Sequence, residues 1–287
     1  MNNTISVIGG DSRQLYAAEY LKNKGYDVCT FATEHGKLTD GIEEAKSISD
    51  AGKSEIIILP LPVSKNGNML NTPLSSEEIF LKDITDIIND NHVVFYGMGS
   101  VNFSRHIKGK ARYSCDYFNI ESLIYKNALL TAEGLISVLL EKLNVTIFGL
   151  KVAIIGYGRI GSLTADRIMS LGGEVSIFAR DDMQRLTAGI RGAKVYSLGY
   201  LENITDSFDV IINTVPYKLI NDGIIANSSK SCVFVEAASA PYGIDADACI
   251  LHGRTLIKAF SLPGKTAPRS AGIIIGETIE NILREVK

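Results

Sequence analysis

Apolar runs alternate with amphipathic stretches in the order typical of a parallel sheet covered by helices. The chain opens with an apolar run at residues 5–8, continues with a helical pattern at 12–24 and returns to a strand-like run at 26–31. Residues 152–179 repeat this order. A strand, a glycine turn, a helix and a second strand form the opening of a parallel sheet. The pattern predicts an α/β protein with two Rossmann-like parallel-sheet domains flanking a cleft and linked by long helices.

The remaining elements can be placed from the same pattern. Helices are expected at residues 76–89, with Ser75 or Ser76 as N-cap, and at residues 101–108. Residues 120–143 are apolar at mixed three- and four-residue steps, which predicts a long helix packed on more than one surface. A last helix is expected at residues 267–286 and should return to the first half of the chain. Further strands are expected at residues 55–59, 93–96, 112–115, 195–196, 209–213, 232–236 and 255–259.

The most specific motif follows the first strand of the second half. Gly156, Gly158 and Gly161 form a G-x-G-x-x-G sequence, with Arg159 and Ile160 between the last two glycines. The three glycines allow a tight turn, close approach of the backbone to a pyrophosphate, and packing of the next helix on the strand. The strand before the motif and the helix after it predict a dinucleotide site formed by these five residues.

Arg180 indicates which dinucleotide is bound. It follows the second strand of the second half, where NAD-binding proteins usually carry an acid that accepts a hydrogen bond from the adenosine ribose. A guanidinium at this position suits the 2′-phosphate of NADP instead. We therefore expect NADP as the cofactor, and the alternative is a solvated loop charge.

Three further segments of the second half are expected to line the cofactor. Thr214, Val215 and Pro216 end a strand and would pass under the nicotinamide ribose. Ala238 follows the next strand, where a small residue allows contact between the backbone and the nicotinamide, and Leu262 begins the turn that closes the cleft. The expected organisation is an N-terminal flavodoxin- or Rossmann-like substrate domain at 1–120, a long linking helix at 121–145, an NADP-binding Rossmann domain at 146–264 and a C-terminal helix at 265–287.

Two turns offer sites for the anionic groups of a substrate. Asp11 and Arg13 lie in the glycine turn after the first strand, where a helix N-terminus and a planar guanidinium can meet a carboxylate. Lys265 and Thr266 precede the last helix, whose first amides form a second candidate anion site. Ser64, in a polar loop, is expected to face the cleft. The alternatives are an ordinary turn with a solvated arginine, a helix cap without a ligand, and a connecting loop.

Two polar residues, Thr131 and Glu133, interrupt the apolar pattern of the long central helix. A carboxylate on such a face costs free energy unless it is paired, so it is either exposed or functional. Glu133 is therefore the candidate general base, with Thr131 beside it. The alternative is a solvated glutamate on a helix surface.

Composition excludes several other classes of function. The 287 residues carry a formal net charge of −3 and 21% charged residues, so no strong field favours nucleic acid or a membrane surface. The apolar runs are too short to span a bilayer, and the N-terminus lacks the basic region of a signal peptide. The four cysteines and four histidines are scattered, which predicts free thiols of a reducing compartment, the cytoplasm, and no metal site.

Several of these motifs together resemble a known family, the A subunit of dipicolinate synthase. The resemblance runs over nearly the whole chain in the same order. The first and last motifs are more specific than the shared dinucleotide fingerprint. The motifs that carry it are residues 7–15, 58–60 with 63–64, 131 with 133–134, 156–161, 212–216, and 262–264 with 267–268 and 271–272.

The resemblance implies a reaction and a partner. It implies synthesis of dipicolinate, a pyridine-2,6-dicarboxylate of bacterial endospores, from the product of dihydrodipicolinate synthase, with NADP as acceptor and a flavoprotein-like B subunit as partner. The enzyme would act in the cytoplasm of the mother cell. Oxidation of a dihydropyridine to an aromatic ring is downhill, so it needs orientation more than strong acid–base catalysis. The two carboxylates match the two candidate anion sites, and Glu133 or a water would accept the proton.

Two other functions fit parts of the sequence. A 2-hydroxyacid dehydrogenase has a similar layout, but residues 238–240 supply no arginine and residues 262–268 supply no histidine for its chemistry. A non-catalytic NADP-binding regulatory protein of a two-subunit synthase is also compatible, particularly if the B subunit performs the reaction. The sequence leaves the oligomeric state open, including a homo-oligomer.

Overall fold

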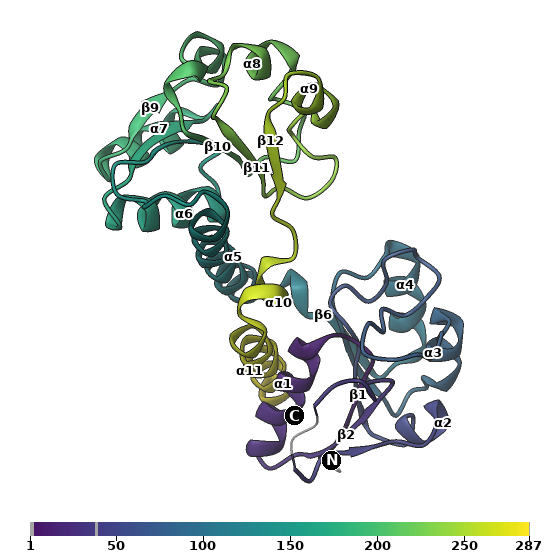
Figure 1. Ribbon diagram of the computed structural model, residues 1–287. Coiled ribbons are helices and arrows are strands. Elements are labelled where there is room, and N and C mark those ends of the chain that lie inside the picture. Colours follow the sequence, from purple (N-terminus) through teal and green to yellow (C-terminus); the bar gives the residue numbers. More distant parts are fainter. Residues whose placement is uncertain (1–2, 38–39, 287) are drawn as a thin grey trace. The chain divides into compact units, whose positions relative to one another are not determined.

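The computed structural model describes residues 3–37 and 40–286, and the chain divides into two compact units (Figure 1). Unit 1 comprises the residues up to Asn127 together with those from Pro263 onward. Unit 2 comprises Ala128–Leu262. The expected segments at 1–120 and 265–287 include residues 1, 2, 38, 39 and 287, which lie outside the described residues.

Unit 1 contains a six-stranded parallel sheet in the order β3-β2-β1-β4-β5-β6. The order reverses between β1 and β4, so the carboxyl ends of these two strands border the crevice where open α/β sheets bind ligands. The strands are β1 (Thr4–Ile8), β2 (Asp27–Phe31), β3 (Glu43–Glu44), β4 (Ile56–Ile58), β5 (Val93–Tyr96) and β6 (Tyr113–Asp116).

The helices of unit 1 come from both ends of the chain. The C-terminal helix α11 lies beside α1 (Figure 1), and Ile275 and Ile279 of α11 join the core that contains Ala17 and Leu21 of α1. The helices of unit 1 are α1 (Ser12–Asn23), α2 (Ile48–Ala51), α3 (Leu81–Ile87), α4 (Val101–Lys110), the 3-10 helix η1 (Tyr117–Asn119), the start of α5 (Glu121–Lys142), most of α10 (Leu262–Thr266), and α11 (Pro268–Val286).

Unit 2 repeats the topology of unit 1. Its parallel sheet has the order β12-β11-β10-β7-β8-β9, which reverses between β7 and β10 as the first sheet does between β1 and β4. The predicted α/β class with two Rossmann-like sheets is therefore confirmed. The elements are β7 (Lys151–Ile155), α6 (Arg159–Ser170), β8 (Glu174–Phe178), α7 (Asp182–Ile190), β9 (Lys194–Tyr196), η2 (Leu198–Asn203), η3 (Thr205–Ser207), β10 (Val210–Asn213), α8 (Asp222–Asn227), β11 (Val233–Glu236), α9 (Ala246–Leu251) and β12 (Thr255–Lys258).

The helix expected at residues 76–89 is shorter than predicted and begins at Leu81. Ser75 and Ser76 do not cap it, because both bind the Glu34 carboxylate: the Ser75 hydroxyl at 2.9 Å and the Ser76 amide at 2.6 Å. The residue before the helix is Phe80, whose amide donates to Asp83. A contact with a residue about forty positions away thus overrides the local capping signal.

The long helix α5 contributes to the cores of both units, as its mixed apolar spacing predicted. Leu123 lies in a core of unit 1, whereas Leu135 and Leu139 lie in a core of unit 2. By length and composition alone α5 could cross a membrane, since one 18-residue window has a mean hydropathy of 1.4. In that window 44% is buried inside the protein, and core helices pass the same test.

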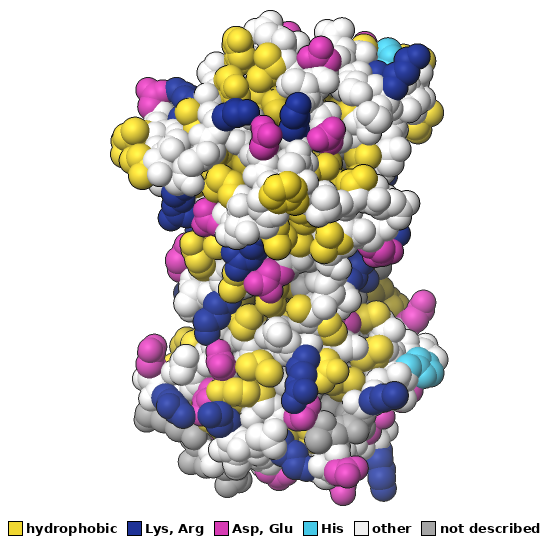
Figure 2. Space-filling view, turned by 60° about the vertical axis from the view of Figure 1, so that its left-hand side comes forward, with side chains coloured by type: hydrophobic (Ala, Val, Ile, Leu, Met, Phe, Trp, Pro, Cys, Tyr) yellow, Lys and Arg dark blue, Asp and Glu magenta, His cyan; other side chains and the backbone are white. Residues whose placement is uncertain are grey.

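Charged side chains of both signs are mixed on the face of the molecule that Figure 2 shows. Figure 2 shows lysine and arginine interspersed with aspartate and glutamate over the visible face. This mixture agrees with the small net charge of −3.

The substitution Gly272→Ala should destabilise the pair formed by α1 and α11. A Cβ at this position would overlap the Arg13 carbonyl oxygen and lie 2.5 Å from the Tyr16 Cβ, so the two helices would have to separate. We expect a loss of about 2 kcal/mol, measured as a lower midpoint of thermal unfolding. Gly109→Ala in α4 is the matched control. Nothing lies within 4 Å of its added methyl group, so stability should stay unchanged or rise by up to about 1 kcal/mol. Equal losses in the two variants would contradict the packing explanation.

Candidate functional site

The glycine turn after β7 is closely packed by its own backbone and by the end of β10. Gly156 has φ +93°, and a Cβ there would lie 2.6 Å from Val215 Cγ2 and 2.8 Å from Thr214 Oγ1. A Cβ on Gly161 would overlap the Gly156 carbonyl oxygen. The first and third glycines of the motif are thus required by packing, which brings the start of α6 onto the end of β7.

Gly158 differs from the other two glycines of the motif because its surroundings are open. No atom lies within 4 Å of the position that its Cβ would take. It occupies the N-cap position of α6 with extended backbone and no side-chain cap. A ligand can therefore approach the first amides of α6 directly, as a pyrophosphate requires. The residues present fit a dinucleotide at this turn.

Arg180 lies two residues beyond the end of β8. β8 pairs with β7, the strand that leads into the glycine turn. Its side chain is exposed and makes no hydrogen bond or ion pair within the described ranges. The neighbouring carboxylates are already engaged: Asp181 accepts from the Gln184 amide at 2.9 Å, and Asp182 pairs with Arg185. Among the described residues the guanidinium of Arg180 therefore has no partner, and its contact with a cofactor stays a prediction.

The other residues expected at the cofactor lie in unit 2 with different exposures. The Thr214 hydroxyl donates to the Ile155 carbonyl at 2.8 Å, which ties the end of β10 to the glycine turn. Ala238 and Leu262 are buried, at 3% exposure each, so their side chains are part of the protein interior. Val215 and Ile160 are half-buried; Arg159 and Pro216 are exposed.

Glu236 and Asn213 form a buried polar pair that sequence reasoning did not single out. Both are buried, and they end the adjacent strands β11 and β10 in register. The Asn213 side-chain amide donates to Glu236 Oε1 at 2.7 Å. An acid at the end of an apolar strand was the available signal, because such a group needs partners to be buried.

In unit 1, Asp11 and Arg13 are bound to each other. Asp11 caps α1, and its carboxylate accepts from Arg13 Nε and Nη2 at 2.9 Å each. Arg13 Nη2 also donates to the Leu61 carbonyl at 2.5 Å. The Nε–Nη2 edge expected to hold a substrate carboxylate is thus occupied by Asp11. A ligand would meet Nη1, and a substrate role for Arg13 stays a prediction.

The two turns predicted as separate anion sites lie side by side. A Cβ on Gly264 of α10 would lie 3.2 Å from Arg13 Nε and 3.5 Å from Asp11 Oδ2. Lys265, the next residue, is exposed. Thr266 ends α10, and Ala267 holds the position directly before α11. The two turns therefore meet at the carboxyl edge of the first sheet, and anion binding by either of them stays a prediction.

Ser64 lies in a loop that is tied to this edge but uses its hydroxyl locally. The hydroxyl accepts from the Gly67 amide at 3.0 Å and donates to Asn66 Oδ1 at 3.3 Å. The loop joins the first glycine turn through the Gly10 amide, which donates to the Asn71 carbonyl at 2.9 Å. Ser64 thus stabilises a turn, and its contact with a substrate stays a prediction.

Glu133 is paired within unit 2. Its carboxylate lies 3.2 Å from Arg167 Nη2 of α6, and its side chain is 57% exposed. Exposure and pairing remove the energetic cost that made this residue a candidate base. Thr131, two residues earlier in α5, is buried. The roles of Glu133 and Thr131 in proton transfer stay predictions.

The cysteines are poor nucleophiles. All four are free, and burial raises the pKa of the Cys232 thiol to about 12 and that of Cys249 to about 11. Burial also raises the pKa of Cys29 and Cys115. Since the thiolate is the reactive form, these side chains are suited to packing and not to covalent catalysis.

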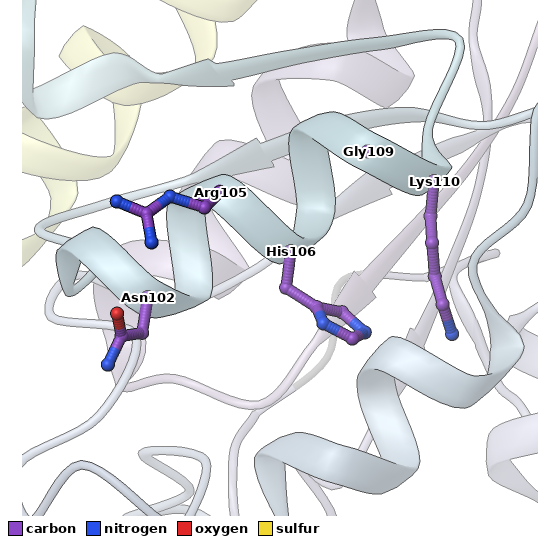
Figure 3. A pocket seen from close by; sticks show the side chains of 5 residues that line it. All are labelled: Asn102, Arg105, His106, Gly109 and Lys110. Carbon is purple, nitrogen blue, oxygen red and sulfur yellow. The ribbon is translucent and has the colours of Figure 1, made fainter.

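A hollow of about 410 Å³ lies on the surface of α4 in unit 1 (Figure 3). Its lining residues are three and four positions apart, so they share one face of a single helix. Figure 3 shows that their polar ends do not converge on one point. The hollow is therefore an open surface and not an arranged ligand site. Its lining residues are Asn102, Arg105, His106, Gly109 and Lys110.

Two family models match consecutive parts of the chain. Residues 4–118 match the N-terminal domain of the A subunit of dipicolinate synthase. Residues 116–248 match the NAD-binding domain of D-isomer specific 2-hydroxyacid dehydrogenases. Unit 2 therefore carries a nicotinamide-dinucleotide-binding domain of the dehydrogenase type.

Relatives that match over the whole chain agree with these domains. The dipicolinate synthase A subunit of Bacillus subtilis (strain 168) is 27% identical over 288 residues, covering 99% of this chain and 96% of the relative. The crystal structure of the dipicolinate synthase A chain from Bacillus subtilis superposes with a TM-score of 0.86 at 25% identity, covering 100% of this chain and 97% of that one. That of the Bacillus halodurans A subunit also gives 0.86, at 23% identity, covering 98% and 97%. The chain thus resembles the dipicolinate synthase A subunit over nearly its whole length, as its motifs indicated.

Proposed function

We propose that this protein oxidises dihydrodipicolinate, or its hydrated precursor, to dipicolinate with NADP as electron acceptor. The observation that carries the proposal is the open glycine turn at Gly158 beside the available guanidinium of Arg180, in a chain that resembles the dipicolinate synthase A subunit in both units. The comparisons support a nicotinamide-dependent oxidoreductase. The use of NADP and the identity of the substrate are our proposal.

In this proposal unit 2 holds the cofactor. The first amides of α6, at Gly158 to Gly161, bind the pyrophosphate, and Arg180 binds the 2′-phosphate. Thr214, Val215 and Ala238 border the nicotinamide half. When bound, NADP supplies the hydride acceptor.

Unit 1 supplies the groups that orient the dicarboxylate. Arg13 Nη1, Lys265 and the start of α11 bind a carboxylate, while Asp11 holds the guanidinium in one orientation. Dihydrodipicolinate loses a hydride and one proton, and its hydrated precursor would lose a water molecule as well. Aromatisation makes the loss favourable, so fixing the ring supplies most of what is needed. Glu133 or a water accepts the proton.

The resemblance also suggests the setting of the reaction. We propose that the protein works with a flavoprotein-like B subunit in the cytoplasm of the mother cell of a sporulating bacterium. A 2-hydroxyacid dehydrogenase-like reaction is the second candidate, because residues 116–248 match the cofactor domain of that family. A regulatory NADP-binding protein is the non-catalytic alternative.

The reaction can be tested with the purified chain, by itself and together with the B subunit. We expect NADPH absorbance to appear when the chain and NADP are added to enzymatically generated dihydrodipicolinate, because the ring can give up a hydride. A set of 2-hydroxy acids serves as the control substrates. Turnover of a 2-hydroxy acid only would favour the dehydrogenase alternative, and no turnover in either assay would overturn the enzyme hypothesis.

The substitution Arg180→Ala should weaken NADP and leave NAD nearly unchanged. Only NADP carries the 2′-phosphate that the guanidinium is proposed to bind, so we expect about a tenfold or larger rise in the Kd for NADPH. Fluorescence titration with NADPH and NADH measures both. Lys230→Ala, another exposed cation of unit 2, is the control. An unchanged NADPH affinity in Arg180→Ala would show that the cofactor assignment is wrong.

The substitution Lys265→Ala should raise KM for the dicarboxylate by on the order of tenfold, with little change in NADP affinity. The side chain is exposed, so its loss should not disturb the fold. Steady-state kinetics at saturating NADP measures the effect. Lys108→Ala, on the exposed face of α4, removes the same charge elsewhere in unit 1. The same KM in both variants would remove Lys265 from the substrate site.

A further inference from the structure

Glu236 is a buried carboxylate whose role the proposed reaction does not yet explain. It is 2% exposed, and it makes no ion pair with any Lys, Arg or His of the described residues. Burying a carboxylate without a cation is costly unless several hydrogen-bond donors surround it. The position of those donors therefore shows what this side chain holds in place.

Four donors meet the two oxygens of Glu236. Oε1 accepts from Asn213 Nδ2 at 2.7 Å and from the Ala238 amide at 3.0 Å. Oε2 accepts from the amides of Gly243 and Ile244 at 2.7 and 2.9 Å. The loop at residues 237–244 is thus fixed near both of its ends by one side chain.

Asn213 extends this network to the glycine turn. Its Nδ2 also donates to the Val215 carbonyl at 2.9 Å, and its Oδ1 accepts from the Val215 amide at 3.2 Å. Val215 in turn packs against Gly156. A Cβ on Gly243 would overlap the Asn213 amide, so the loop approaches as closely as a glycine allows. A hydrogen-bonded network therefore joins the ends of β10 and β11, and the packing of Val215 against Gly156 connects it with the turn after β7.

The strand order places this network on one side of the glycine turn. β7 lies between β8, which leads to Arg180, and β10, which is followed by β11. A dinucleotide with its pyrophosphate at the turn and its adenosine beyond β8 has its nicotinamide beyond β10 and β11. We propose that Glu236 is a positioning residue, an inference that rests on the proposed function. Together with Asn213, it holds Val215 and the loop at residues 237–244 in the geometry that binds the nicotinamide half of the cofactor.

Glu236→Gln tests this role with two ligands. The substituted amide presents an N–H where the carboxylate accepted one, so at least one backbone donor loses its partner. NADPH carries the nicotinamide, whereas 2′,5′-ADP carries only the adenosine with its 2′- and 5′-phosphates. Titration of each should show NADPH weakened by about tenfold or more, with a smaller enhancement of nicotinamide fluorescence. The affinity for 2′,5′-ADP should change by less than about twofold, because Arg180 and the first amides of α6, which are proposed to bind its phosphates, are not among the hydrogen-bonded groups around Glu236.

Glu280→Gln is the matched control. Glu280 is also buried, at 5% exposure, and it accepts from the Tyr20 hydroxyl at 2.9 Å and from Arg284 at 2.5 Å, all in unit 1. The same substitution there should leave both affinities unchanged. If Glu236→Gln does not fold, Asn213→Ser tests the same role, because it leaves the three backbone donors to Glu236 in place. The measurement is again the affinity for NADPH relative to that for 2′,5′-ADP.

The outcomes separate this inference from the proposed function. Equal weakening of NADPH and 2′,5′-ADP, or no weakening of either, would overturn the positioning role while NADP binding by the unsubstituted protein stands. Failure of the unsubstituted protein to bind NADPH would overturn the proposed function, and the positioning role with it.

Discussion

The close approach of a helix to the strand before it is the constraint on which both units depend. In unit 2, α6 can start over the end of β7 because Gly161 has no side chain to meet the Gly156 carbonyl. In unit 1, α1 follows β1 through Gly9 and Gly10, which both have positive φ. Each turn lies where the strand order of its sheet reverses, at the edge where such sheets bind ligands. At α6 no side chain caps the helix start, whereas at α1 Asp11 and Gln14 form a capping box.

Charged groups at these two edges divide into bonded and exposed sets. Arg13 is buried and bound by Asp11 and Leu61, and Glu236 is buried and bound by four donors. A buried charge keeps one geometry, because leaving any of its partners costs free energy. Arg180 and Lys265 are exposed and available to a ligand. The bonded charges therefore shape the loops, and the exposed ones are the groups that we assign to anion binding.

Much of the fold could be predicted because it depends on local patterns. The strand at residues 93–96 agrees with β5 to the residue, since a fully buried parallel strand is an uninterrupted apolar run. The start of α3 could not be predicted, because Glu34 binds the residues that were expected to cap it. Residues 262–264, which were expected to form a turn, belong to the helix α10. This helix approaches Arg13 at Gly264, a glycine whose φ is not in the left-handed region.

By itself, the sequence determined the fold class, the glycine turn after β7 and the cation that follows β8. These features depend on apolar periodicity and on the backbone freedom of glycine, which are properties of short segments. Only the tertiary structure decided that Arg13 holds Asp11 beside Gly264, that Glu133 pairs with Arg167, and that Glu236 anchors a loop. Each of these depends on which distant segments meet and on the direction of individual hydrogen bonds, and neither is encoded in the local pattern of apolar and polar residues.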